Sequence, residues 1–305
     1  MTDDDRAPAS AGDSGQKDLI GVRPAHYLSL HDGRPMPIDG SVIDEAIACI
    51  SVNGEDLASF MCTPRDLIEL AIGFLYNEGV IDGLEDIRAH HLSKSRTCVD
   101  IWLKDMEFQR PRRAIITAGC GGGVTFDDFS AVYKPLTSEL QATPRQLSNL
   151  MRQLQLGAEL YQEARGVHTA VLAEAGRAGE EQIVLQSEDI GRHNCLDKLM
   201  GAALLAGIPT KDRVLLSSGR ISSEMINKAR RLETPIVCSR TSPTSLSLAL
   251  AEAWNITVVA YLRQDRMRVY THPERLVLPD HNRPETQDHD PKVFNKPSSV
   301  VDGLS

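Results

Sequence analysis

From residue 143 onward, segments typical of helices alternate with segments typical of strands, and this alternation constrains the fold more than any other sequence feature. Residues 143–165 are expected to form one capped helix, followed by a hairpin of strands at 167–174 and 181–189. Further strands are expected at 213–218, 235–240 and 256–262, each preceded by a helix. Because such alternation needs crossover connections, we predict an α/β domain with a mostly parallel mixed sheet and helices on both faces.

The first third of the chain predicts a smaller α+β domain. Residues 46–63 are expected to form a hairpin around the turn Asn53-Gly54, and residues 98–104 a further strand. Between them we expect a helix that has Pro64 at its first position and ends at Gly79. We therefore predict an N-terminal domain at residues 22–142, an α/β domain at 143–278, and disordered polar tails at 1–21 and 279–305.

The composition excludes several classes of function. The chain has 305 residues and a net charge of −9, which disfavours non-specific binding to nucleic acid or anionic lipid. No apolar stretch approaches the ~18 residues of a membrane span, and residues 1–18 do not resemble a signal peptide, so we expect a cytoplasmic protein. Residues 219–240 nevertheless carry five Lys/Arg against two Glu, which leaves room for a local anion site.

One cysteine stands in an unusual setting. In "ITAGCGGGV" (116–124), Cys120 is surrounded by glycines, which leave its sulfur unobstructed and its loop free to move. A tight turn with an incidental cysteine is the alternative. No C-x-x-C pair exists for zinc or a redox dithiol, and in the cytoplasm we expect all six cysteines to be reduced: Cys49, Cys62, Cys98, Cys120, Cys195 and Cys238. Because thiolate chemistry needs exposure, Cys120 is our candidate catalytic residue.

Polar residues gather where the strands of the second half end, which is where α/β sheets bind ligands. Hydroxyls, backbone amides and arginines at one sheet edge suit phosphate groups. The alternative is that these residues are helix caps, solvated arginines and a structural histidine. The candidate ligand-binding residues are Asp189, His193, Asn194, Ser218, Gly219, Arg220, Ser242, Thr244, Tyr261, Leu262, Arg263, Gln264, Asp265 and Arg266.

Several motifs together resemble the formate dehydrogenase accessory sulfurtransferase family. They run in order from about residue 40 to 277 and include "VNGE", "ELAIGFLYNEGVI", the Cys120 loop, "SEDIGRHNCLDK", "SSGRISSEMINKA", "SRTSPTSLSLALAE" and "VVAYLRQDRMRVYTHPERL". The resemblance implies a homodimer whose second half is a three-layer, cytidine-deaminase-like domain. In the family the loop commonly reads C-G-x-C-G, whereas Gly123 replaces the second cysteine here and leaves Cys120 as the sole carrier.

The resemblance also implies a reaction. Such proteins accept sulfur as a persulfide from a cysteine desulfurase and pass it to the bis(molybdopterin guanine dinucleotide) cofactor before it enters the formate dehydrogenase catalytic subunit. Cys120 would carry the sulfur, the family's cofactor-binding stretch maps onto residues 261–266, and GDP would be a partial mimic of the cofactor.

Two other functions stay open. A deaminase-like sheet suggests a zinc nucleobase deaminase, but the signature H-x-E with P-C-x-x-C is missing, because Asn194-Cys195 follows His193 and "SSGRISSE" stands where the thiolates belong, so we assign no metal ligands. A chaperone that binds the cofactor without transferring sulfur is the third interpretation, and only Cys120 argues against it.

Overall fold

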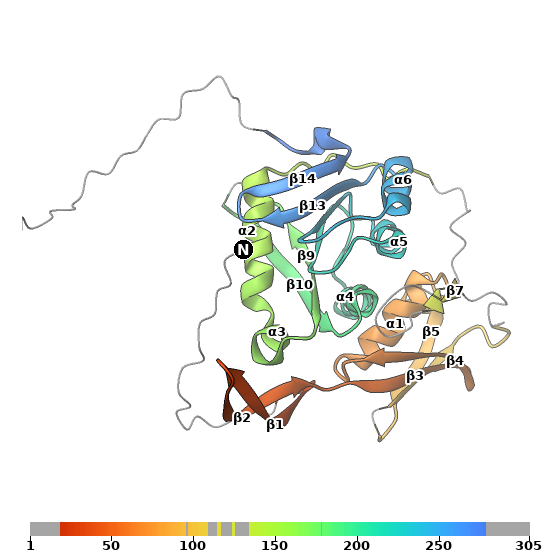
Figure 1. Cartoon of the computed structure of the whole chain (residues 1–305). Helices are drawn as coiled ribbons and strands as arrows, with labels where there is room; N and C mark the ends of the chain where they lie inside the picture. Colours follow the sequence, from red (N-terminus) through yellow and green to blue (C-terminus); the bar gives the residue numbers. More distant parts are fainter. Residues whose placement is uncertain are drawn as a thin grey trace, which may run out of the picture.

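The computed structural model describes residues 19–95, 97–108, 115–116, 124–125, 134–177 and 179–278 (Figure 1). Its largest sheet has six strands in the order β10-β9-β11-β12-β13-β14. Their bounds are β9 (His168–Glu174), β10 (Gln182–Asp189), β11 (Val214–Ser217), β12 (Ile236–Ser239), β13 (Thr257–Arg263) and β14 (Arg266–Thr271). The mixed α/β fold predicted from the alternating segments is confirmed.

The parallel part of this sheet is narrower than predicted. β11 pairs with β12 and β12 with β13 in parallel, whereas β9–β10, β9–β11 and β13–β14 are antiparallel. The last predicted strand ends at residue 262, but the chain turns at Gln264-Asp265 and returns as β14. β14 escapes detection because its side chains are mostly exposed and polar, so it has no apolar alternation.

Helices cover both faces of the sheet, as predicted. On one face lies α2 (Pro144–Gly157), and on the other lie α4 (Arg192–Ala206), α5 (Ser223–Arg231) and α6 (Ser245–Ala253) (Figure 1). Thr143 caps α2 through a capping box, but the helix expected to reach residue 165 is interrupted at Ala158 and resumes as α3 (Glu159–Ala164). Before α2, Leu136 and Ala142 pack in the cores of this second half.

The first half contains a four-stranded sheet in the order β4-β3-β6-β5, with α1 (Leu67–Asn77) packed against it. The strands are β3 (Ala46–Val52), β4 (Glu55–Cys62), β5 (Ile87–Leu92) and β6 (Cys98–Leu103). A short 3-10 helix at Leu84–Asp86 precedes β5, and a second one, at Pro273–Arg275, follows β14 in the second half. The hairpin turn at Asn53-Gly54 is confirmed. The helix start at Pro64 is wrong, because the backbone of Thr63 is bonded to Asp189 and Lys198 and α1 begins only at Leu67.

Two short ribbons complete the described chain. β1 (Val22–His31) and β2 (Arg34–Ile43) form an antiparallel pair that contacts α3 through the Ser41 hydroxyl and Glu163, 2.7 Å apart. β7 (Ile115–Ile116) pairs with β8 (Val124–Thr125), and these strands bracket residues 117–123. Cys120 and Gly123 therefore lie outside the described residues, as do both predicted tails apart from residues 19–21.

The two halves meet where α1 crosses α4, and two glycines allow the helices to touch. A Cβ atom on Gly73 would lie 1.8 Å from the carbonyl oxygen of Asp197. A Cβ atom on Gly201 would lie 1.9 Å from the carbonyl oxygen of Glu69. Each helix therefore presents a glycine to the backbone of the other, and neither position has room for a side chain.

The expectation that every cysteine is reduced is wrong for Cys49 and Cys98, which form a disulfide. The two residues are direct neighbours in the parallel pairing of β3 with β6, and their Cα atoms are 4.5 Å apart. Their separation of 49 residues along the chain gave no sign of this proximity. Among the described residues, no helix is both long and apolar enough to cross a bilayer.

Candidate functional site

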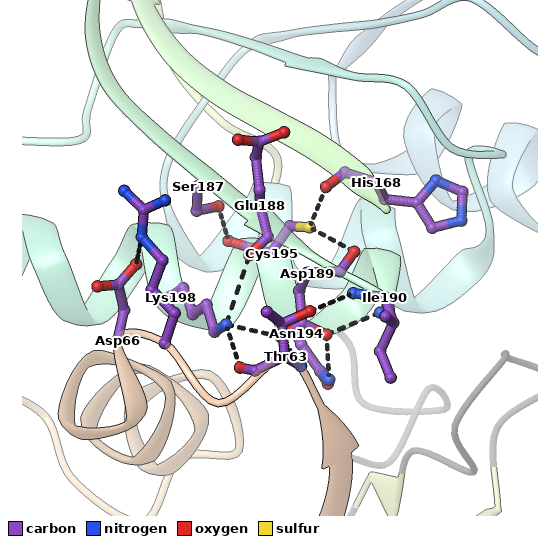
Figure 2. Close-up of polar contacts among 12 residues, drawn as sticks. Thr63, Asp66, His168, Ser187, Glu188, Asp189, Ile190, Asn194, Cys195 and Lys198 are labelled. Atoms are coloured by element: carbon purple, nitrogen blue, oxygen red, sulfur yellow. Dashed lines mark hydrogen bonds and ion pairs between the residues drawn. The ribbon is translucent and has the colours of Figure 1, made fainter. Parts of the chain in front are cut away.

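The junction between β10 and α4 is a buried polar cluster that joins the two halves (Figure 2). Asp189 is completely buried, and its carboxylate lies 2.6 Å from Nζ of Lys198. The same carboxylate accepts hydrogen bonds from the backbone N–H of Thr63 at 3.1 Å and of Gly191 at 2.7 Å, and from Nδ2 of Asn194 at 2.8 Å. The Asp189 carboxylate and the Asn194 amide therefore bind other groups of the protein, although both residues are predicted to bind a ligand.

This cluster holds the start of α1 against the second half. Lys198 Nζ also donates to the carbonyl oxygen of Thr63 at 3.1 Å, and Asn194 Nδ2 donates to that of Met61 at 3.0 Å. A buried ion pair with satisfied hydrogen-bonding groups fixes a geometry, and losing one partner leaves the other charge uncompensated. We assign Asp189 and Asn194 a structural role.

Replacing Asp189 with Asn is expected to lower the free energy of unfolding by about 3–5 kcal/mol, because it leaves the Lys198 ammonium buried without its counter-ion. The control is Arg23→Met, which breaks the pair between exposed Arg23 and Asp44 and should cost less than about 1 kcal/mol. Urea denaturation measures both. Equal, small effects would contradict the structural role.

His193 lies at the start of α4, and its two ring nitrogens contact two residues at the start of α5. Its Nε2 is 3.1 Å from the Ser222 hydroxyl, and its Nδ1 is 3.0 Å from the Glu224 carboxylate. Burial, reinforced by the Lys228 ammonium, lowers the pKa of His193 to about 2, so the ring is neutral at physiological pH. Within the described residues, no group of three or more His, Cys, Asp or Glu is arranged to bind a metal ion.

The ion pair of Lys228 extends this cluster to α1. Lys228 Nζ lies 2.7 Å from Asp197, whose other carboxylate oxygen accepts from Nδ2 of Asn77 at 2.7 Å. Burial lowers the pKa of Lys228, but Asp197 and Glu224 outweigh it and hold that pKa above its ordinary value. Lys228 therefore keeps its charge, which in turn favours the neutral form of His193.

The depressed pKa of His193 predicts a pH dependence of stability. Below pH 6.5 the unfolded chain protonates this histidine while the folded chain does not until about pH 2, so the free energy of unfolding should fall as the pH drops through that window. His193→Gln should flatten the slope between pH 6.5 and 4 by up to about 1.4 kcal/mol per pH unit. The control His90→Gln, on exposed β5, should not change it.

The end of β11 passes close to two side chains. The Ser218 hydroxyl accepts from the backbone N–H of Thr169 at 3.0 Å and lies 3.3 Å from Nδ1 of His168. A Cβ atom on Gly219 would lie 3.0 Å from Cβ of Arg192, so this glycine permits a close approach. Arg220 is exposed. His168, which sequence reasoning missed, faces this junction, and burial lowers its pKa.

After β12, the candidate residue Thr244 is a helix cap, as the alternative interpretation of these polar residues predicts. Thr244 caps α6 through its hydrogen bond from the Ser247 backbone N–H, and the carbonyl oxygen of Ser242 accepts from the Ile221 N–H at 3.1 Å. Gln155 on α2 turns its side-chain amide oxygen toward Arg240. In this orientation Nη1 of Arg240 donates a hydrogen bond to that oxygen at 2.7 Å. Thr244 and Ser242 therefore shape the junction, while the guanidinium of Arg240 lies beside α2.

The candidates at 261–266 form the tight hairpin between β13 and β14. Leu262 is completely buried in the core under α2, so its side chain is structural and only its backbone belongs to the hairpin surface. Tyr261 has a left-handed backbone (φ 52°), and the Arg268 guanidinium stacks 4.4 Å from its ring centre. Arg263 on β13 and Arg266 on β14 are opposite each other in the antiparallel ladder. Both arginines, and Gln264 and Asp265 between them, are exposed. The turn is thus a mostly exposed, basic edge.

The described cysteines offer no accessible thiol. Burial raises the pKa of Cys62 to about 12 and that of Cys195 and Cys238 well above the ordinary value. Cys49 and Cys98 share the disulfide. The placement of Cys195 in the core and Cys238 in a strand is confirmed.

Sequence reasoning recognised the dense motif around His193 but missed its partners. Thr63, Asn77 and Lys228 come from elements more than 30 residues away, and each looks unremarkable in its own segment. The only available signal was charge, since Asp197 and Lys198 interrupt an otherwise apolar helix and must have buried partners.

Comparison with known proteins identifies the family. The model of the FdhD/NarQ family matches residues 43–277, which include both sheets and every junction described above. The chain belongs to the FdhD/NarQ family. This confirms the resemblance seen in the sequence motifs.

Similar FdhD/NarQ proteins include one from Staphylococcus aureus strain MRSA252 named sulfur carrier protein FdhD, which is 36% identical over 251 residues, covering 81% of this chain and 93% of the relative. Its counterpart in strain Newman is 35% identical with the same coverage. A crystal structure described as a formate dehydrogenase accessory protein from Desulfotalea psychrophila superposes with a TM-score of 0.69 at 26% identity, covering 84% of this chain and 99% of the other.

Proposed function

We propose that this FdhD/NarQ protein is a sulfur carrier for formate dehydrogenase maturation. In this proposal a cysteine desulfurase loads sulfur onto Cys120 as a persulfide. The protein then acts as a sulfurtransferase and passes that sulfur to the bis(molybdopterin guanine dinucleotide) cofactor, its second substrate, before the cofactor enters the formate dehydrogenase catalytic subunit.

The observation that carries the proposal is the condition of the other cysteines. Three of the five that the structure describes are buried with raised pKa values, and the remaining two are joined to each other. A thiol nucleophile reacts as the thiolate and needs access to its partner, and these five satisfy neither condition. Because a similar protein is named a sulfur carrier and these five cysteines are unsuitable, we assign Cys120 as the carrier in this chain.

The loading step is a thiol exchange without net oxidation. The Cys120 thiolate attacks the outer sulfur of the desulfurase persulfide, the sulfur–sulfur bond to the donor cysteine breaks, and that cysteine leaves as a thiolate. The product is a persulfide on Cys120. Gly123 removes the second cysteine common in the family loop, so the proposal uses one thiol rather than a dithiol.

The same proposal assigns the cofactor to the strand ends of the second half. Support comes from exposed Arg220, Arg263 and Arg266 at the ends of β11 and β13 and the start of β14. His193 is neutral and internally bonded, so we give it a positioning role at this edge rather than direct contact with phosphate.

GDP is expected to bind as a partial mimic of the cofactor, with at least micromolar affinity that weakens as salt rises. Arg220→Ala combined with Arg263→Ala should weaken binding at least about tenfold, because two charge-assisted bonds are lost. Arg88→Ala, on exposed β5, is the control. Calorimetry that finds no GDP binding, or equal binding by all three proteins, would contradict this assignment.

A chaperone that holds the cofactor without transferring sulfur is the competing function. The two are separated by loading the protein with radiolabelled sulfur from cysteine and a desulfurase, and then adding cofactor and the dehydrogenase catalytic subunit. A carrier hands the label to the cofactor, whereas a chaperone never acquires it. A zinc deaminase is disfavoured by the donor set, because the ring nitrogens of His193 contact a hydroxyl and a carboxylate, and the described part of the chain holds no cluster of metal-ligating side chains.

A further inference from the structure

His168 is a half-buried histidine whose ring points out of the cluster around Asp189. It is the first residue of β9 and lies opposite Asp189 in the antiparallel pairing with β10. In Figure 2 its backbone carbonyl faces Cys195, while its imidazole points away from the Asp189–Lys198 pair. Because β11 runs antiparallel to β9, the start of β9 and the end of β11 share one edge of the sheet.

Two arginines act on the imidazole at this edge. A Cβ atom on Gly219 would lie 3.0 Å from Cβ of Arg192 and 3.3 Å from Nδ1 of His168, so both side chains pack against the same glycine. Arg220, the next residue, is exposed. Burial, together with the charges of Arg192 and Arg220, lowers the pKa of His168 below its ordinary value. The ring is therefore neutral at physiological pH.

One acid opposes the arginines, and its charge is already balanced. Among the described acids, Asp189 is the one whose charge favours a protonated His168. Its carboxylate lies 2.6 Å from Nζ of Lys198 and accepts hydrogen bonds from two backbone N–H groups. An anionic group placed against His168, Arg192 and Arg220 would therefore meet net positive charge and compensate it.

A hydroxyl determines which ring nitrogen carries the proton. Ser218 Oγ accepts from the backbone N–H of Thr169 at 3.0 Å and lies 3.3 Å from Nδ1 of His168. In the part of the chain that the structure describes, Nδ1 is the acceptor that this hydroxyl reaches, so the hydroxyl donates to it. The neutral ring then carries its proton on Nε2 and presents an N–H donor there.

We propose that His168 binds a phosphate group of the cofactor through Nε2 and gains a proton as that group binds. No covalent bond forms or breaks. Nε2–H donates to a phosphate oxygen, Nδ1 takes a proton from solvent, and the Ser218 hydroxyl turns to accept from Nδ1. An opposite charge within about 4–6 Å favours the protonated imidazole. The inference rests on the proposed function, because it uses the same cofactor edge, and it adds that binding there depends on pH.

The test compares GDP binding by the full chain and by His168→Gln. Glutamine keeps a donor and an acceptor but cannot gain a proton. The ratio of the wild-type affinity to that of His168→Gln should rise at least about threefold, and at most about tenfold per pH unit, as the pH falls from 8 to 6.5. The ionisation of GDP itself cancels in this ratio. His90→Gln, on exposed β5, is the matched control and should follow wild type. Calorimetry in two buffers of different ionisation enthalpy measures the affinity and the protons taken up.

A second variant covers the case in which His168→Gln fails to fold. Arg220→Gln changes an exposed side chain, and losing its charge should raise the pKa of His168 in the free protein. NMR of histidine-labelled protein measures this titration, and adding GDP to the wild-type chain should raise the pKa of the same histidine.

Two results would overturn the role of His168 while leaving the sulfur carrier in place. One is GDP binding with an affinity ratio that does not change with pH, and the other is a set of histidine titrations unchanged by Arg220→Gln. A wild-type chain that binds no GDP would overturn both this role and the assignment of the cofactor to this edge. Persulfide loading of Cys120, measured by mass on the same samples, tests sulfur transfer separately.

Discussion

Cells that carry only the Cys120→Ser variant are expected to lose formate dehydrogenase activity by more than about 100-fold, because serine cannot form a persulfide and none of the five described cysteines is accessible. The substitution exchanges a single atom of one side chain, so thermal unfolding and GDP binding should stay close to wild type. The measurement is formate oxidation in extracts of cells lacking the native protein. Activity near wild type would show that the chain acts as a chaperone.

Cys195→Ala is the matched control for that experiment. Cys195 is fully buried, and its thiol donates to the carbonyl oxygen of His168 at 3.3 Å. Its loss should cost about 1–2 kcal/mol of stability and leave sulfur transfer intact. Together the two variants separate chemistry from folding, since one removes a reactive thiol and the other a packed one.

Gly201→Ala and Gly73→Ala are each expected to lower the free energy of unfolding by at least about 3 kcal/mol, which corresponds to a drop of about 6–12 °C in melting temperature. Each new methyl group would lie less than 2 Å from a backbone carbonyl oxygen of the opposite helix. The helices would have to separate, and this would strain the buried ion pairs of Asp189 and Asp197 beside the crossing.

Gly157→Ala is the control for the helix crossing. Gly157 ends α2, and a Cβ atom there would meet only the end of the Gln186 side chain, which can rotate away. The expected change is within about 1 kcal/mol in either direction. If calorimetry gives the three alanine variants similar melting temperatures, the close approach of α1 and α4 is wrong.

The sequence predicted what local pattern determines. The hairpin at Asn53-Gly54, the capping box at Thr143 and the alternating helices and strands of the second half all follow from short-range signals, and all are present. β14 was missed because an edge strand with exposed polar side chains has no apolar alternation to reveal it. The late start of α1 was missed because it depends on bonds between Thr63 and residues more than 120 positions away.

The candidate site, like the fold, was predictable only where its signal lies within one short segment of the chain. The motif around His193 was recognisable as unusual because charged residues occupy a helix that should be apolar. Its structural role was not recognisable, because Asn77, Thr63 and Lys228 complete the cluster from distant elements. A dense set of polar residues in one short stretch therefore indicates either a ligand site or an interface within the chain, and only the packing of α1 on α4 distinguishes the two.

The most direct test of the sulfur-carrier account is the intact mass of the wild-type protein after incubation with a cysteine desulfurase and cysteine. The account predicts a gain of about 32 Da, one sulfur atom, that reductant removes and that peptide mapping assigns to Cys120. No gain in mass, or a gain that maps to another cysteine or persists in Cys120→Ser, would contradict it.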